Sequence, residues 1–115
     1  MKRHFLLYLV LALVTTGLTP TQVSAAPDPF MQQIEKITAL VEQKNWTEAE
    51  KHTDKLPEVF KRVKWKYQLL GDENEYEEIE KEIFNVRAAV HKKDSTQAAV
   101  SLASIRAMVH LIYTL

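Results

Sequence analysis

The sequence contains no cysteine and only two glycines among its 115 residues. Without cysteine the chain cannot form a disulfide, a thiolate zinc site, a thiol nucleophile or a lipidated cysteine. No segment alternates polar and apolar residues over the length of a strand, which argues against a β-sheet. The fold must therefore be all-α and must be stabilised by its hydrophobic core alone.

Charge of one sign is also lacking, because 15 basic residues balance 15 acidic ones. This balance offers neither the basic surface of a nucleic-acid-binding protein nor a polybasic membrane patch. The sequence has no G-x-S-x-G, no H-E-x-x-H and no phosphate-binding loop. It therefore predicts no enzyme, no cofactor and no nucleic-acid partner.

The longest apolar run is Phe5–Leu18, which follows the basic residues Lys2 and Arg3. It is shorter than the roughly 20 residues of a membrane span, and Val23–Ser24–Ala25 follows as a small-residue cleavage motif. We predict that residues 1–25 form a signal peptide cleaved after Ala25. The alternative is an uncleaved anchor. In both cases residues 26–115 form an extracytoplasmic domain, either secreted or held at the outer face of the cytoplasmic membrane.

Four apolar stripes with steps of three and four residues predict four helices. The first covers about 29–43, the second lies between Asn45 and Gly71, the third starts at Asp72, and the fourth starts after Asp94 or Ser95. The second is the longest, and its stripe consists of Trp46, Ala49, Thr53, Leu56, Phe60, Val63, Tyr67 and Leu70.

The helix ends are also marked in the sequence. Asn45 and Asp72 are each followed three residues later by glutamate, a pattern typical of helix starts. Gly71 is expected to end the second helix in the left-handed backbone conformation. Pro57 lies inside that helix, and because the stripe continues past it we predict a bent helix rather than two helices.

Short breaks between the helices favour antiparallel neighbours. We therefore expect a four-helix up-down-up-down bundle with a long, bent second helix. The alternative is a hairpin of the second and third helices that completes its core by forming a homodimer.

The histidines give little support for a metal site. Glu48 and His52 are one helical turn apart, but no glutamate lies three residues before any histidine, as a di-metal carboxylate bundle requires. His110 stands in an apolar stretch and is expected to be partly buried. We predict no metal ion.

Trp65 and Phe84 fall outside the apolar stripes. One interpretation is that they pack at the periphery of the core. The other is that they form an exposed aromatic patch for a partner, with Trp65 flanked by Lys64 and Lys66. A tryptophan among cations suits either a protein interface or the headgroup region of a membrane.

The chain from Trp46 to its end resembles the domain-of-unknown-function family 4363. The residues that carry the resemblance are Trp46 with Ala49, Trp65 with Leu69–Leu70, Asp72 followed by Glu75, Glu78 and Ile79, and the late series Ile105, His110, Ile112 and Tyr113. The resemblance implies a small helical envelope protein from endospore-forming or related bacteria, with a hydrophobic segment at its amino terminus. Many members have histidine directly after the aspartate, where this chain has Glu73.

These patterns lead to two functional hypotheses. The first is a non-enzymatic exported bundle that binds another envelope component, a membrane protein, through Trp65, Lys64, Lys66 and Phe84. The second is a bundle that senses or sequesters a small apolar ligand or lipid between the second and third helices.

Overall fold

The computed structural model describes residues 28–114, so the predicted signal segment lies outside the described residues. The described part contains four α-helices, α2 (Pro29–Glu42), α3 (Trp46–Leu70), α4 (Glu73–His91) and α5 (Ser95–Thr114), and no strand. The predicted all-α class and the four helices are confirmed, with helix ends within about two residues of those expected.

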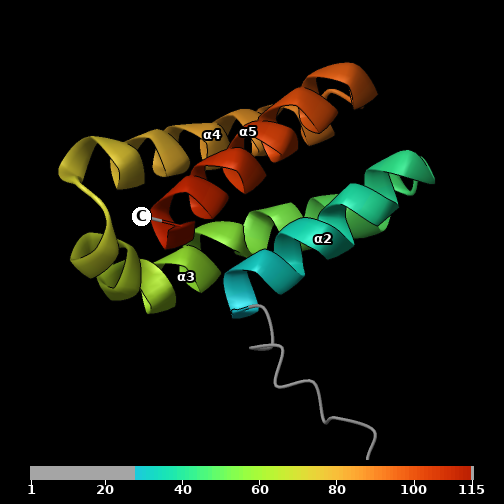
Figure 1. Cartoon of the computed structure of the whole chain (residues 1–115). Coiled ribbons are helices and arrows are strands. Elements are labelled where there is room, and N and C mark those ends of the chain that lie inside the picture. Colours follow the sequence, from blue (N-terminus) through green and yellow to red (C-terminus); the bar gives the residue numbers. More distant parts are fainter. Residues whose placement is uncertain (1–27, 115) are drawn as a thin grey trace, which may run out of the picture.

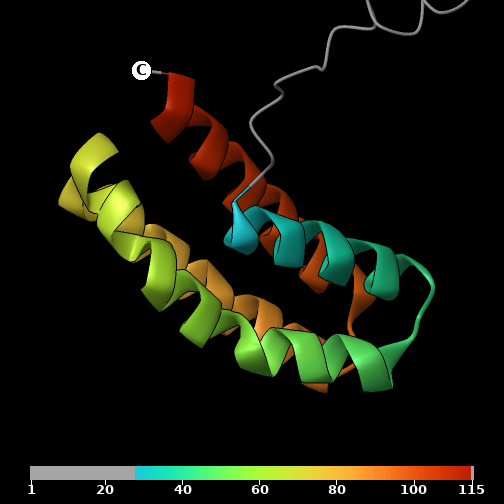
Figure 2. The same cartoon turned by 90° about the horizontal axis from the view of Figure 1, so that it is seen from below.

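The helices form an antiparallel bundle in which each packs against its neighbours in the sequence (Figures 1 and 2). The bundle closes because α2 also packs against α5. The apolar faces of α3 and α4 are therefore covered by helices of the same chain. A second copy is not needed to complete the core, as the hairpin alternative had required.

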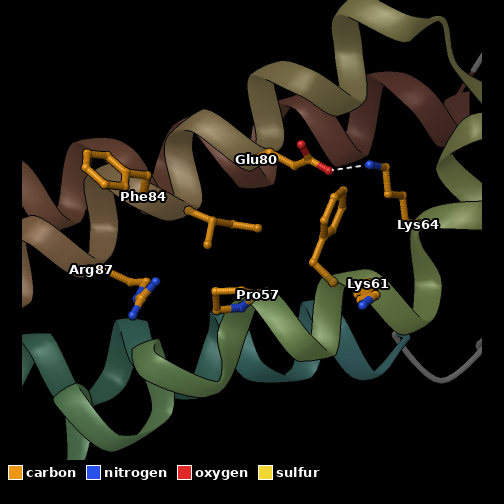
Figure 3. Close-up of a pocket in the computed structure, with 8 residues that line it drawn as sticks. Pro57, Lys61, Lys64, Glu80, Phe84 and Arg87 are labelled. Atoms are coloured by element: carbon orange, nitrogen blue, oxygen red, sulfur yellow. Dashed lines mark ion pairs between the residues drawn. The ribbon is translucent and has the colours of Figure 1, made fainter.

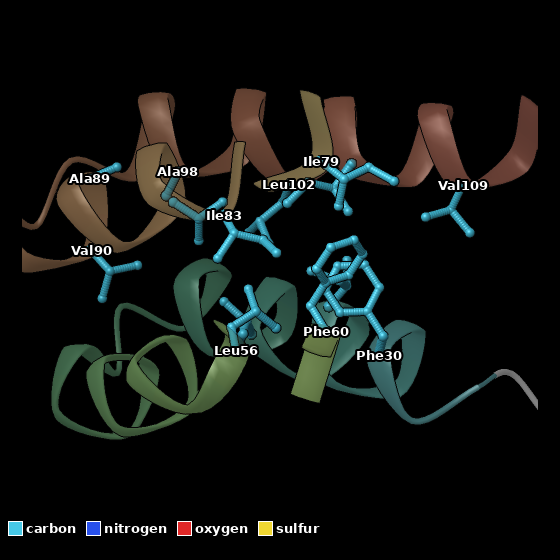
Figure 4. Packing of buried hydrophobic residues seen from close by; sticks show 14 of the residues in the cluster. Phe30, Leu56, Phe60, Ile79, Ile83, Ala89, Val90, Ala98, Leu102 and Val109 are labelled. Atoms are coloured by element: carbon cyan, nitrogen blue, oxygen red, sulfur yellow. The ribbon is translucent and has the colours of Figure 1, made fainter. Parts of the chain in front are cut away.

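The core runs along the bundle between the two helix layers (Figure 4). It contains nearly every residue of the four predicted stripes, including Phe30, Phe60 and Tyr67, whose rings contact one another. Two expectations were wrong. Leu70, the last residue of α3, is exposed, and His110 is exposed because its side chain lies outside the buried face of α5.

The α2–α3 and α4–α5 corners use the same backbone motif. Lys44 and Lys93 have φ angles of 55° and 57°. Each directly follows the C-cap residue of its helix, which is Gln43 in α2 and Lys92 in α4. At the first corner Lys44 N–H donates to the carbonyl of Val41 and Asn45 N–H to that of Leu40. The second corner repeats this pair of bonds, which defines the Schellman ending of a helix. The left-handed positions of this fold are therefore occupied by lysine.

Gly71 does not adopt the left-handed conformation that the sequence suggested. Its φ and ψ are −115° and 179°, so the backbone is extended as it leads into Asp72, the N-cap of α4. Space explains the glycine instead. A Cβ atom here would lie 3.3 Å from both Cγ1 of Ile112 and the carbonyl oxygen of Tyr67, and the flexible Glu75 carboxylate would have to move aside. The missing side chain allows the end of α5 to approach the α3–α4 turn.

Pro57 lies inside α3 without breaking it, as predicted. Proline cannot donate the helical hydrogen bond to the carbonyl of Thr53, and such positions bend helices. Figure 2 shows α3 as one continuous, gently curved helix beside α4.

Asp28 connects the start of α2 to the ends of α3 and α5. One carboxylate oxygen accepts a hydrogen bond from Met31 N–H at 2.8 Å and so caps α2. The other accepts from the hydroxyls of Tyr67 at 2.8 Å and Tyr113 at 3.0 Å. The tyrosine rings also contact each other edge to face. Burial, followed by the hydrogen bond to Asp28, raises the pKa of both phenols above the usual value of 10.0.

The raised pKa of Tyr67 predicts a loss of stability at high pH. Above pH 10.0 the unfolded chain releases the phenolic proton whereas the folded chain retains it, so the free energy of unfolding falls as pH rises. One such group contributes a slope of at most about 1.4 kcal/mol per pH unit. The free energy of unfolding, measured with urea between about pH 9 and pH 11.5, should fall less steeply with pH for Tyr67→Phe than for the native chain. Equal slopes would contradict the assignment.

Candidate binding surface

Trp65 and Phe84 are both exposed, at 57% and 69% of their surface. The interpretation of these rings as peripheral core packing was therefore wrong. The ammonium of Lys66 lies 5.6 Å from the centre of the Trp65 ring, so these two neighbours form one cation–π contact on the outside of α3. Phe84 lies on the outer side of α4.

A pocket of about 380 Å³ lies between α3 and α4 (Figure 3). Its size is within the range of about 300–1,000 Å³ that is common for ligand sites. The apolar part of its lining comes from Pro57, Phe60, Ile83 and Phe84. Phe60 and Ile83 belong to the core, whereas Phe84 extends towards solvent. The pocket thus joins the buried core to the exposed aromatic ring.

The charged part of the lining is mostly basic, with Lys61, Lys64 and Arg87 against the single carboxylate of Glu80. Lys64 and Glu80 form an ion pair of 2.6 Å that connects α3 to α4 at one end of the pocket (Figure 3). The hydrogen bond to Glu80 raises the pKa of Lys64, so its ammonium remains charged at neutral pH. The Lys64 ammonium also lies 5.0 Å from the centre of the Tyr76 ring.

Arg87 lies towards the opposite end of the pocket (Figure 3). Its Nε atom is 3.6 Å from Asp54 Oδ1, and this buried nitrogen has no hydrogen-bond partner among residues 28–114. A buried donor without a partner is costly. Glu80 is paired to Lys64, and Arg87 forms an ion pair with Asp54. Lys61 therefore leaves positive charge beside an apolar surface. This arrangement suits a group that is apolar on one side and anionic on the other.

The four residues predicted to contact a partner lie in two separate parts of the structure. Lys64 and Phe84 line the pocket, whereas Trp65 and Lys66 do not. The sequence did not indicate Pro57, Lys61, Ile83 or Arg87 as site residues. In an antiparallel hairpin, residues at nearly equal distances before and after the turn lie opposite each other. Applied to the Gly71–Asp72 turn, this rule would have paired Lys64 with Glu80 and Pro57 with Arg87.

A cluster of Glu50, Asp54 and His91 lies on the exposed surface of the same helix pair. The His91 ring stands between the two carboxylates, with Nδ1 at 3.1 Å from Glu50 and Nε2 at 3.1 Å from Asp54. One ligand atom of each residue lies within 4.8 Å of the others, but both ring nitrogens contact carboxylates here, whereas a metal ion would take one of these nitrogens together with the carboxylates. We interpret the cluster as a contact between α3 and the end of α4.

His52, which the sequence places one helical turn after Glu48, takes part in a contact between helices. Its Nδ1 lies 3.0 Å from Oε1 of Gln33 on α2. Burial, with Lys36 as the second cause, lowers the pKa of His52 below its usual value. The neutral imidazole is therefore favoured at neutral pH, which suits a hydrogen bond to an uncharged amide.

The fold and this surface define a small all-α four-helix bundle with a pocket between two of its helices. The chain belongs to the family described as Domain of unknown function (DUF4363), whose model matches residues 19–115. The family resemblance seen in the sequence is thus confirmed. No curated protein and no solved structure matches the chain. Within residues 28–114, no helix has the length and apolar character needed to cross a membrane.

Proposed function

We propose that this chain is a non-enzymatic exported bundle that binds another component of the cell envelope, a membrane protein, through the outer face of α3 and α4. The observation that carries the proposal is the pocket beside Phe84, which has an apolar floor and three basic side chains for one acidic one. The export itself is inferred from residues 1–25 of the sequence.

The chemistry of the pocket suggests which part of a partner it receives. An apolar side chain would cover Phe84 and fill the space above Phe60 and Ile83, while a nearby carboxylate would pair with Lys61. Exposed aromatic residues beside such a depression are the usual centres of protein interfaces. Trp65 and Lys66 lie outside this pocket and are assigned to a different surface below.

A second candidate function is binding of a small amphipathic anion, for example a lipid-derived carboxylate, in the same pocket. The observation in its favour is the pocket volume, which suffices for a small ligand. It corresponds to the ligand site that the sequence predicted between the second and third helices.

Site-specific photo-crosslinking distinguishes the two functions. A photoreactive phenylalanine analogue is placed at position 84 of the full chain in cells of the native host, and adducts are identified by mass spectrometry. Because Phe84 is 69% exposed, the replacement leaves the core intact. We expect one discrete adduct with an envelope protein, and we expect Lys61→Glu to reduce its yield severalfold because the substitution reverses the charge at the pocket.

Val100 is the matched control, since it is an exposed apolar residue on α5 that does not line the pocket. The analogue at position 100 should give no such adduct. A small-molecule adduct at position 84 without a protein adduct would favour the second function. The same protein adducts from positions 84 and 100 would refute a specific site.

A further inference from the structure

Most of the large apolar side chains that remain exposed lie near the ends of two helices. Seven such side chains occur among the described residues, and Phe84 and Val100 are the two that do not belong to this group. The other five form what we call the apolar end, which consists of Trp65, Leu69 and Leu70 on α3 and Leu111 and Tyr113 on α5. Leu69 is the most exposed, at 76%.

Two sets of contacts place these residues at one end of the bundle. The hydroxyls of Tyr67 and Tyr113 donate to the same Asp28 oxygen, which brings the ends of α3 and α5 together. Ile112 also lies against Gly71, which is the residue that follows Leu70. In Figure 1 the carboxyl terminus is next to the α3–α4 connection, and the two corners formed by Lys44 and Lys93 lie at the other end. A cluster of exposed apolar residues of this kind usually marks a contact surface.

The position of Asp28 indicates what covers this surface. Asp28 binds the last turns of α3 and α5, so the preceding chain joins the bundle at the apolar end. Nine residues lie between Leu18, the last residue of the apolar run, and Asp28. The ten steps from Leu18 to Asp28 span at most about 36 Å when the chain is fully extended. We propose that the apolar run is retained as the uncleaved anchor, and that the apolar end rests on a lipid bilayer with the bundle axis directed away from the membrane.

The composition of the apolar end fits a lipid surface. Tryptophan and tyrosine favour the boundary between headgroups and acyl chains, and Trp65 and Tyr113 are exposed near the same helix ends as the leucines. Lys66, packed over the Trp65 ring, can reach the phosphate layer. The acidic residues Asp72 and Glu73 lie two and three residues after Leu70, so attraction to anionic lipids is not the main force. The contact therefore depends on apolar burial and requires no anionic lipid.

Nitroxide labelling of single cysteines tests this orientation, because the native chain has no cysteine. The full chain is reconstituted in phosphatidylcholine vesicles with a label at Leu69→Cys or Leu111→Cys. Both side chains are exposed, so the labels do not disturb the core. We expect relaxation by oxygen, which concentrates in lipid, to exceed relaxation by a water-soluble nickel complex severalfold.

Lys44→Cys and Lys93→Cys are the matched controls at the other end of the bundle, and their labels should respond mainly to the nickel complex. Adding Leu111→Glu should lower the relaxation of the label at position 69 by oxygen and raise its relaxation by the nickel complex, towards the values of the controls. High salt should leave the oxygen and nickel relaxation of the label at position 69 unchanged. The proposal is overturned if labels at 69 and 111 are as accessible to nickel as those at 44 and 93. Spin–spin broadening at position 69 would also overturn it, because a second copy would then cover the apolar end.

Discussion

Replacing Phe30 by alanine is expected to lower the free energy of unfolding by about 3–5 kcal/mol. Phe30 is completely buried at the start of α2, with its ring centre 5.0 Å from that of Phe60 and 6.1 Å from that of Tyr67. The substitution leaves a cavity in an aromatic cluster that α2 and α3 share. Because small domains are stable by only about 5–15 kcal/mol, the variant should be close to unfolding at ambient temperature.

Urea unfolding followed by circular dichroism measures this effect, and Phe84→Ala is the matched control. The control removes the same side chain from an exposed position, so it should change stability by less than about 0.5 kcal/mol. Similar losses in both variants would mean that the burial of Phe30 is not what stabilises α2.

Replacing Asp28 by alanine is expected to lower the free energy of unfolding by about 2–4 kcal/mol. The loss of the helix cap accounts for about 1 kcal/mol. The remainder arises because the hydroxyl of Tyr67, which is completely buried, loses its acceptor, and an unsatisfied buried group costs about 1–3 kcal/mol. The bond from Tyr113 is lost as well.

Asp72→Ala is the matched control, because Asp72 caps α4 through Glu75 N–H alone. It should cost about 1 kcal/mol. Combining Asp28→Ala with Tyr67→Phe should cost less than the sum of the two single changes, because the orphaned hydroxyl is removed together with its acceptor. If the Asp28 and Asp72 variants were equally stable, Asp28 would be an ordinary cap and not a junction between three helices.

The buried faces and the starting points of the helices were the features most accurately predicted from the sequence. The stripe from Ala49 to Tyr67 predicted the buried face of α3, and the caps Asn45 and Asp72 predicted where α3 and α4 begin. These features are readable because helix periodicity and capping depend on residues within one or two turns. Pro57 could be placed inside a continuous helix for the same reason.

Residues at the ends and outer faces of the helices were harder to predict. The reason for Gly71 is its close approach to the Tyr67 carbonyl and to Ile112, and Ile112 lies about forty residues further along the chain. The left-handed corners fell on Lys44 and Lys93, since the Schellman bonds outweigh the modest cost of that conformation for a side chain. Trp65 and Phe84 could not be assigned to core or surface from periodicity alone.

The sequence by itself determined an all-α bundle, its four helices and most of its core, because each amphipathic stripe specifies its own buried face. Only the tertiary structure decided which outer side chains share a surface. It brought Arg87 to the pocket beside Pro57, and it gathered Leu69, Leu111 and Asp28 at one end of the bundle. Such groupings depend on the relative rotation and offset of packed helices, which are set by the fit of side chains across the core and not by any local pattern.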